Sequence, residues 1–161
     1  SVLWEYNQPD PTTGVSPDAD IGYTYSRPQI ARLNNGEWAA IFGNGYDSDN
    51  EKAYLYIVNL ADGSLIKRIE ADTSCASGCG NGLSTPILYD YNNDKITDYV
   101  FAGDLQGNLW KFDLSSSDED DWGLAYSGTP LFVARNDSST RQPISAQPKL
   151  TAHPNGGVMV L

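Results

Sequence analysis

The sequence has few of the features that define helical, thiolate-metal, membrane-spanning or nucleic-acid-binding proteins. Its 161 residues include two cysteines, one histidine and one methionine. Helical periodicity is rare, and no apolar run approaches the roughly 20 residues of a membrane-spanning helix. Lys and Arg number 10 against 21 Asp and Glu, which gives a formal net charge of -11. Because no cluster of cations is dense enough to bind phosphates, we do not expect nucleic acid as a partner.

The chain ends and the cysteines indicate a piece of a longer, exported protein. The sequence starts at "SVLWEY", without Met, and stops on the apolar run "GGVMVL". Cys75 and Cys79 lie four positions apart among Ser, Gly and Asn, a context that favours a short-range disulfide. Free thiols are the alternative. Zinc is not expected, because two thiols and the distant His153 do not complete a four-ligand site.

Short strands and tight turns dominate the rest of the pattern. Asn-Gly, Asp-Gly and Gly-Asn pairs at 35–36, 62–63 and 107–108 stand between apolar runs and predict hairpins, hence antiparallel sheets. The expected strands are rich in β-branched and aromatic residues. They lie in residues 37–43, 53–60, 64–70, 85–90, 97–104, 107–114 and 129–134.

An internal repeat organises these strands. Residues 26–46 align without a gap with residues 84–104, and more loosely with 145–161. Pro28, Pro86 and Pro148 mark the phase, at steps of 58 and 62 residues. Such a step holds about four short strands, which is one propeller blade and is close to the kelch-type period of roughly 50 residues.

The predicted fold is therefore all-β, with antiparallel four-stranded blades of a partial β-propeller. One blade is expected at about 27–70, a second at about 84–134, and the start of a third at about 145–161. A β-sandwich is the alternative, although its strands need no phased repeat. Residues 113–123 are expected to form a solvated acidic loop. Trp38, Trp110 and Trp122 are interpreted as sheet-packing residues.

The segment "DYNNDKITD" is the candidate functional site. It places Asp90, Asn92, Asp94 and Asp98 at positions 1, 3, 5 and 9 of one loop, with the backbone carbonyl of Ile96 at position 7. Calcium takes 6 to 8 oxygen ligands, whereas magnesium demands a stricter octahedron and keeps its waters. The spacing predicts one Ca²⁺ site. The alternative is a hairpin tip rich in Asx-turns.

A second acidic segment precedes it in the first repeat. Asp47, Asp49 and Glu51 occupy a similar place, but no carboxylate follows at the ninth position. We predict a plain solvated turn there. His153 stands in a turn far in sequence from any nucleophile context, so no catalytic residue is predicted and the chain is not expected to be an enzyme.

Three stretches give the sequence a family resemblance: "RPQIARLNNGEWAAIFGNGY", "NGLSTPILYDYNNDKITDYVFAGDLQGNLWKFDL" and "QPISAQPKLTAHPNGG". Together they resemble the C-terminal propeller domain of PilC/PilY-type adhesins of bacterial type IV pili. The resemblance implies a modified seven-bladed propeller with calcium in a nine-residue loop, on the same five residues named above. Glycines are common in the family at two loop positions where this chain has Asn93 and Lys95, which puts the affinity in question.

The same resemblance implies a location and partners. The protein would be exported to the bacterial cell surface or outer membrane and the pilus tip. It would contact minor pilins and the host-cell surface. Calcium would control pilus extension against retraction, and with it twitching motility and attachment.

Two other functions remain open from the sequence. The segment "GNLWKFDL" also resembles the Trp-bearing blades of quinoprotein dehydrogenases, but those enzymes carry adjacent cysteines, and Cys75 and Cys79 are not adjacent. The other possibility is a calcium-stabilised propeller with a purely structural role.

Overall fold

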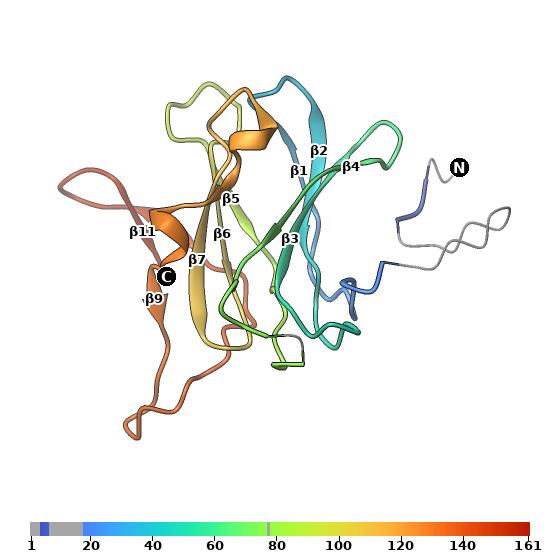
Figure 1. The fold of residues 1–161 in the computed structure, drawn as a ribbon. Helices are drawn as coiled ribbons and strands as arrows, with labels where there is room; N and C mark the ends of the chain where they lie inside the picture. Colours follow the sequence, from blue (N-terminus) through green and yellow to red (C-terminus); the bar gives the residue numbers. More distant parts are fainter. Residues whose placement is uncertain (1–3, 7–17, 77) are drawn as a thin grey trace, which may run out of the picture.

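The computed structural model describes residues 4–6, 18–76 and 78–161. Two antiparallel sheets pack against each other, and a two-stranded ribbon follows them (Figure 1). The predicted all-β fold with antiparallel four-stranded sheets is confirmed. Among the described residues, no helix is long and apolar enough to cross a membrane.

The first sheet, which we call blade 1, is a simple meander of four strands. Each neighbouring pair is antiparallel. The Asn-Gly and Asp-Gly turns predicted from the sequence close two of its hairpins, with Gly36 at φ 90° and Gly63 at φ 77°, values that only glycine adopts readily. The strands are β1 (Gln29–Arg32), β2 (Trp38–Gly43), β3 (Tyr54–Asn59) and β4 (Leu65–Glu70).

The second sheet, blade 2, has the same path and one added strand. Its order is β5-β6-β7-β8, and β9 pairs with the other half of the β7 edge. The strands are β5 (Ile87–Tyr89), β6 (Tyr99–Gly103), β7 (Asn108–Asp113), β8 (Gly123–Leu124) and β9 (Phe132–Val133). Two short 3₁₀ turns, η1 (Glu119–Asp121) and η2 (Tyr126–Gly128), flank β8, and the ribbon consists of β10 (Leu150–Ala152) and β11 (Val158–Val160).

The main core lies between the two blades. Alternate residues of each strand face it, as the period of two in a strand requires. Ile41 and Ile57 of blade 1 and Val100 and Phe112 of blade 2 are fully buried in this cluster. Burying a side chain of this size stabilises the fold by about 1.5–3 kcal/mol. The interface between the blades is therefore the main source of hydrophobic stability.

The tryptophans do not all behave as expected. Trp110 and Trp122 are buried at 3% and 4% exposure, and Trp122 ends the exposed acidic turn η1 by packing into the core. Trp38 is 55% exposed, so its interpretation as a sheet-packing residue was wrong. It is the first residue of β2 and pairs with Arg32 at the end of the hairpin, where the sheet surface is open to solvent.

The gapless alignment of the two repeats is also corrected. In blade 2, nine residues separate Tyr89 from its partner Tyr99, but in blade 1 only seven separate Ala31 from Ala39. The two pairs are equivalent because each lies on the face of its blade that is directed toward the next sheet. Ala31 and Ala39 face blade 2, and Tyr89 and Tyr99 face the ribbon. The loop of blade 2 is thus two residues longer, and its second strand is shifted by two relative to the alignment.

Candidate cation-binding loop

The predicted loop, Asp90–Asp98, joins β5 to β6. It lies at the same end of the blades as the β1–β2 hairpin (Figure 1). Its two halves differ in environment. Residues 91–95 are exposed, whereas Thr97 and Asp98 are each only 6% exposed. The loop therefore has an open half and a half that is docked on blade 1.

In the open half, side-chain oxygens gather around backbone N–H groups. The Asp94 N–H donates to Asp90 Oδ1 at 3.2 Å and to Asn92 Oδ1 at 3.0 Å. Lys95 N donates to Asp90 Oδ2 at 2.8 Å, and Ile96 N donates to Asp94 Oδ1 at 2.8 Å. Three of the five predicted ligand residues are thereby brought together at the loop tip.

In the docked half, the carboxylate of Asp98 turns inward. Its Oδ2 accepts from the backbone N–H of Tyr91 at 2.8 Å, and its Oδ1 accepts from Asn34 Nδ2 at 3.3 Å. The backbone of Asp98 also bonds to Tyr89 O and receives Leu114 N. The ninth loop residue, Asp98, therefore also connects the end of β5 to the residue that follows β7 through its backbone.

Two residues of the loop have a left-handed backbone. Asn93 has φ 63° and Lys95 has φ 71°. These are the two positions at which the resemblance led us to expect glycine. Asn accepts this conformation at modest cost, whereas Lys is strained by about 1–2 kcal/mol. The loop thus adopts a left-handed backbone at both positions without glycine.

The electrostatics of the loop favour an ionised carboxylate at its first position. Desolvation raises the pKa of Asp90, but the backbone N–H groups of Lys95, Asn93 and Asp94 and the Lys95 charge outweigh it and hold the pKa below its ordinary value. A carboxylate that stays charged in this way is the form that binds a cation.

The donor set suits calcium in its chemistry, because it offers three carboxylates, an amide oxygen and a backbone carbonyl. Yet no group of three or more His, Cys, Asp or Glu side chains within the described residues lies close enough to hold a metal ion. Asp90 and Asp94 belong to the tip, and Asp98 to the docked half. Cation binding therefore requires these carboxylates to draw closer than they lie in this structure.

The other sequence-based candidates are simpler. Asp47 and Asp49 are exposed, and Glu51 Oε2 accepts from Gly80 N at 3.1 Å. Cys75 and Cys79 form a disulfide with a Cα–Cα distance of 5.9 Å.

Sequence reasoning missed a buried carboxylate in blade 2. Asp104 is fully buried. Its Oδ2 accepts from Asn81 Nδ2, Asn108 Nδ2 and Trp110 Nε1 at 3.1, 2.9 and 2.8 Å, and its Oδ1 accepts from Asn108 N at 2.8 Å. In blade 1 the equivalent residue is Asn44, whose Oδ1 accepts from Tyr54 N at 2.9 Å. The Gly that precedes both residues was the available signal.

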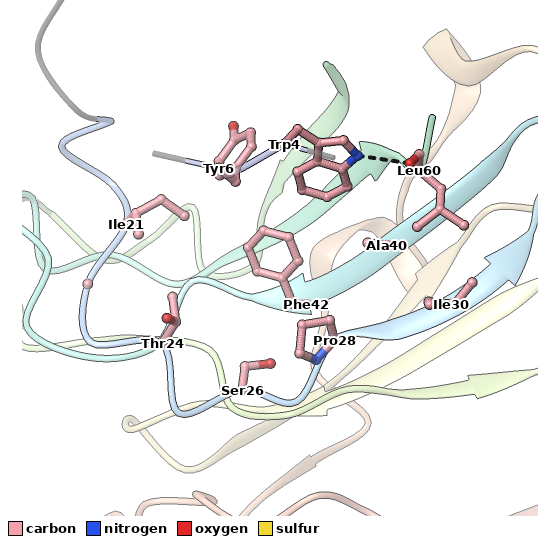
Figure 2. Close-up of a pocket in the computed structure, with 11 residues that line it drawn as sticks. Trp4, Tyr6, Ile21, Thr24, Ser26, Pro28, Ile30, Ala40, Phe42 and Leu60 are labelled. Carbon is pink, nitrogen blue, oxygen red and sulfur yellow. Dashed lines mark hydrogen bonds between the residues drawn. The ribbon is translucent and has the colours of Figure 1, made fainter. Parts of the chain in front are cut away.

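A groove of about 610 Å³ lies on the outer face of blade 1. In Figure 2, Trp4 and Tyr6 stand over Phe42, and the indole N–H of Trp4 donates to Leu60 O at 2.9 Å. Among the lining residues that the structure describes, none is Asp, Glu, Lys, Arg or His. The equivalent face of blade 2, which carries Val100, is buried against blade 1. The groove thus lies on the face of blade 1 that corresponds to a blade-packing face in blade 2.

Four-stranded antiparallel blades with an acidic nine-residue loop define the class of this protein, a partial β-propeller. The family described as "PilY1 beta-propeller domain" matches residues 3–161, and the chain belongs to that family. The resemblance seen in the sequence is confirmed.

Known relatives agree with this assignment. Type IV pilus biogenesis factor PilY1 of Pseudomonas aeruginosa strain UCBPP-PA14 is 45% identical, over 96% of this chain and 14% of the relative. A PilY1 homolog of Xylella fastidiosa is also 45% identical, over 99% of this chain and 11% of the relative. The chain thus spans less than a sixth of the length of either relative. The crystal structure of the Pseudomonas aeruginosa PilY1 C-terminal domain matches with a TM-score of 0.83 at 38% identity, covering 89% of this chain and 32% of that chain.

Proposed function

We propose that this chain is the calcium-binding, non-enzymatic part of a type IV pilus biogenesis factor and tip adhesin. The observation that carries the proposal is the gathering of side-chain oxygens from Asp90, Asn92 and Asp94 around three successive backbone N–H groups, in the same loop as the inward carboxylate of Asp98. An all-oxygen set with three carboxylates is chemistry for a hard divalent cation. The Ile96 carbonyl, next in the loop, would complete the protein ligands.

The bound cation would act through charge. Without it, three carboxylates share one short loop, and their mutual repulsion keeps Asp90 and Asp94 at the tip apart from Asp98. With it, the tip would close onto the docked half. Because Asp98 bonds to Tyr89 and Leu114, the closure would stiffen the end of blade 2. A surface near this end would thus change with calcium.

The family supplies the biological setting of the proposal. The relatives are described as type IV pilus biogenesis factors, so we place the protein at the bacterial surface and pilus tip, after export. Its partners would be minor pilins and the host-cell surface. Calcium occupancy would bias pilus extension against retraction, and so affect twitching motility and attachment.

Calorimetric titration of the purified chain with calcium, with magnesium as competitor, tests the ligand assignment. Asp98→Ala and Asp94→Ala should each lower the affinity by more than the roughly 10- to 100-fold that losing an outer partner of a ligand costs. Asp94 is exposed, so its replacement should not disturb folding. Asp49→Ala, which removes an exposed carboxylate from the other acidic turn, is the matched control and should bind like the parent chain.

The outcomes separate the alternatives. Absence of binding by the parent chain would reduce the loop to a polar hairpin tip. Equal loss in Asp49→Ala would mean that net charge, not the loop, attracts the ion. If Asp94→Ala abolishes binding but the same change in the full-length protein leaves twitching and attachment unchanged, calcium is structural only.

A further inference from the structure

Asn34 of blade 1 reaches across the blade interface into the cation loop of blade 2. Its Nδ2 lies 3.3 Å from Asp98 Oδ1, 3.1 Å from Thr97 O and 3.0 Å from Leu114 O. One amide group thus joins the docked half of the loop to the residue that follows β7. Asn34 itself belongs to the turn between β1 and β2, 64 residues before Asp98.

Backbone pairing fixes Asn34 at this place. Leu33 and Thr97 form a parallel bridge, and Thr97 N donates to Arg32 O at 3.0 Å. The hairpin of blade 1 is closed independently by Leu33 N to Glu37 O and Gly36 N to Leu33 O, both at 2.9 Å. The Asn34 side chain is therefore not needed to close its own turn and is free to serve the loop of the other blade.

The contact with Asp98 orients a desolvated carboxylate. Asp98 is 6% exposed, and the described residues give its side chain two donors, Asn34 Nδ2 and Tyr91 N, one on each oxygen. Removing one of them would let the carboxylate rotate about the other. A ligand that must be reoriented before it binds loses affinity, because the ordering cost is then part of the binding reaction.

We propose that Asn34 is a positioning residue for the cation loop, which it preorganises through Asp98, so that the blade 1 hairpin helps set the affinity of a site in blade 2. The inference rests on the proposed cation binding. Partners that orient a metal ligand typically change affinity by about 10- to 100-fold when they are lost. We therefore expect Asn34→Ala to weaken calcium binding about ten-fold.

The neighbouring Asn35 provides a matched control. Its Nδ2 donates to Glu119 at 3.1 Å, and its Oδ1 receives Glu37 N, so it lies in the same turn and bonds across the same interface without contacting the loop. Asn35→Ala should keep the parent affinity within about two-fold. A ten-fold loss in both variants would show that the hairpin as a whole, and not the Asn34 amide, is responsible, and would overturn the proposal.

A double-mutant cycle separates positioning from general stabilisation. Asp98→Ala removes the carboxylate that accepts from Asn34. If Asn34 acts through Asp98, Asn34→Ala should cost little further affinity in the Asp98→Ala background. If instead the two losses multiply, Asn34 supports the loop only through Thr97 O and Leu114 O, and the proposal fails.

Amide hydrogen exchange of the metal-free chain distinguishes failure of this inference from failure of the proposed function. The Tyr91 N–H is protected only while Asp98 is held in place. Asn34→Ala should speed its exchange, and Asn35→Ala should not. If the parent chain binds no calcium but this difference appears, the positioning role stands and the cation proposal falls. If exchange at Tyr91 is unchanged in Asn34→Ala, the positioning role is refuted.

Discussion

The buried carboxylate of Asp104 can be tested against the amide that stands at the same place in blade 1. Replacing Asp104 by Asn changes almost no volume but converts one oxygen into an N–H₂ group. Three donors converge on Oδ2, from Asn81, Asn108 and Trp110, and the Asn108 N–H points at Oδ1. In either orientation of the new amide, its NH₂ group faces at least one N–H donor and cannot accept a hydrogen bond from it.

The magnitude follows from the better of the two orientations. With its oxygen toward the three donors, the amide keeps them and leaves the Asn108 N–H without an acceptor in a fully buried place. A buried donor left unpaired costs about 1–3 kcal/mol, and the remaining bonds also lose their charge assistance. We expect Asp104→Asn to lower the free energy of unfolding by about 2–3 kcal/mol.

The reciprocal change in blade 1 should also destabilise the fold. Asn44 Nδ2 donates to Asp20 O and to Lys52 O, both at 2.7 Å. In Asn44→Asp a carboxylate oxygen would face these two carbonyl oxygens at the same distance, with no donor between them. Blade 1 therefore requires Asn at this position and blade 2 requires Asp, although the two positions are equivalent in the repeat.

Urea unfolding followed by tryptophan fluorescence measures both changes, since Trp110 and Trp122 lie in the core. The slope of the transition should stay constant, so that the midpoint reports stability. Asp113→Asn, at a partly buried position on the far end of β7, is the control and should shift the midpoint little. A stability of Asp104→Asn within about 0.5 kcal/mol of the parent, the usual range for surface changes, would refute the reasoning.

Three further changes follow from the described contacts. Desolvation raises the pKa of the buried Tyr56 phenol, so the unfolded chain releases this proton near about pH 10 while the folded chain keeps it. This group's contribution to stability is full below about pH 10 and falls by about 1.4 kcal/mol per pH unit above it. In Tyr56→Phe the urea midpoint should therefore depend less on pH between pH 9 and about 11 than in the parent chain. The same dependence on pH in both chains would contradict this. Lys95→Gly should stabilise the chain by up to about 1 kcal/mol, because the strain relieved exceeds the entropic cost of glycine. It should also tighten calcium binding in calorimetry, and Asn93→Gly should do less; equal effects would exclude strain and charge at Lys95 as the cause. Replacing Cys75 and Cys79 by Ser should cost about 2 kcal/mol in thermal unfolding by the chain-entropy model, and an unchanged melting temperature would show that the loop is held without the disulfide.

The fold could be predicted because its signals are local. Turn pairs such as Asn35-Gly36 and Asp62-Gly63 demand a backbone that few other residues accept, and they fix the hairpins on either side. Alternation of apolar residues then assigns each strand two faces. These constraints act over a few residues, so one sequence is enough to read them.

The remaining features depend on contacts between distant segments. Pro28 and Pro86 directly precede the first strand of each blade and so align these strands in the repeat. Their spacing does not reveal the two residues that are inserted before β6. The same limit hid the roles of Asn34 and Asp104. An Asn in a turn and an Asp after Gly103 look like ordinary turn residues until the partner strands are in place. Five candidate ligand residues could be named from spacing, but the contact between Asp98 and Asn34 of blade 1 could not.

The two inserted residues also explain why the loop, and not the blade 1 hairpin, is the candidate cation site. The shorter connection in blade 1 closes with two backbone bonds, Leu33 N to Glu37 O and Gly36 N to Leu33 O, and one bond from Glu37 N to Asn35 Oδ1. In the longer connection of blade 2, the N–H groups of Asp94 and Lys95 bond to side-chain oxygens of the loop. Those oxygens are held inward by the same need to satisfy the backbone. The loop therefore holds the side-chain oxygens of Asp90, Asn92 and Asp94 at its tip through its own backbone N–H groups, whereas Asp98 stays in the docked half.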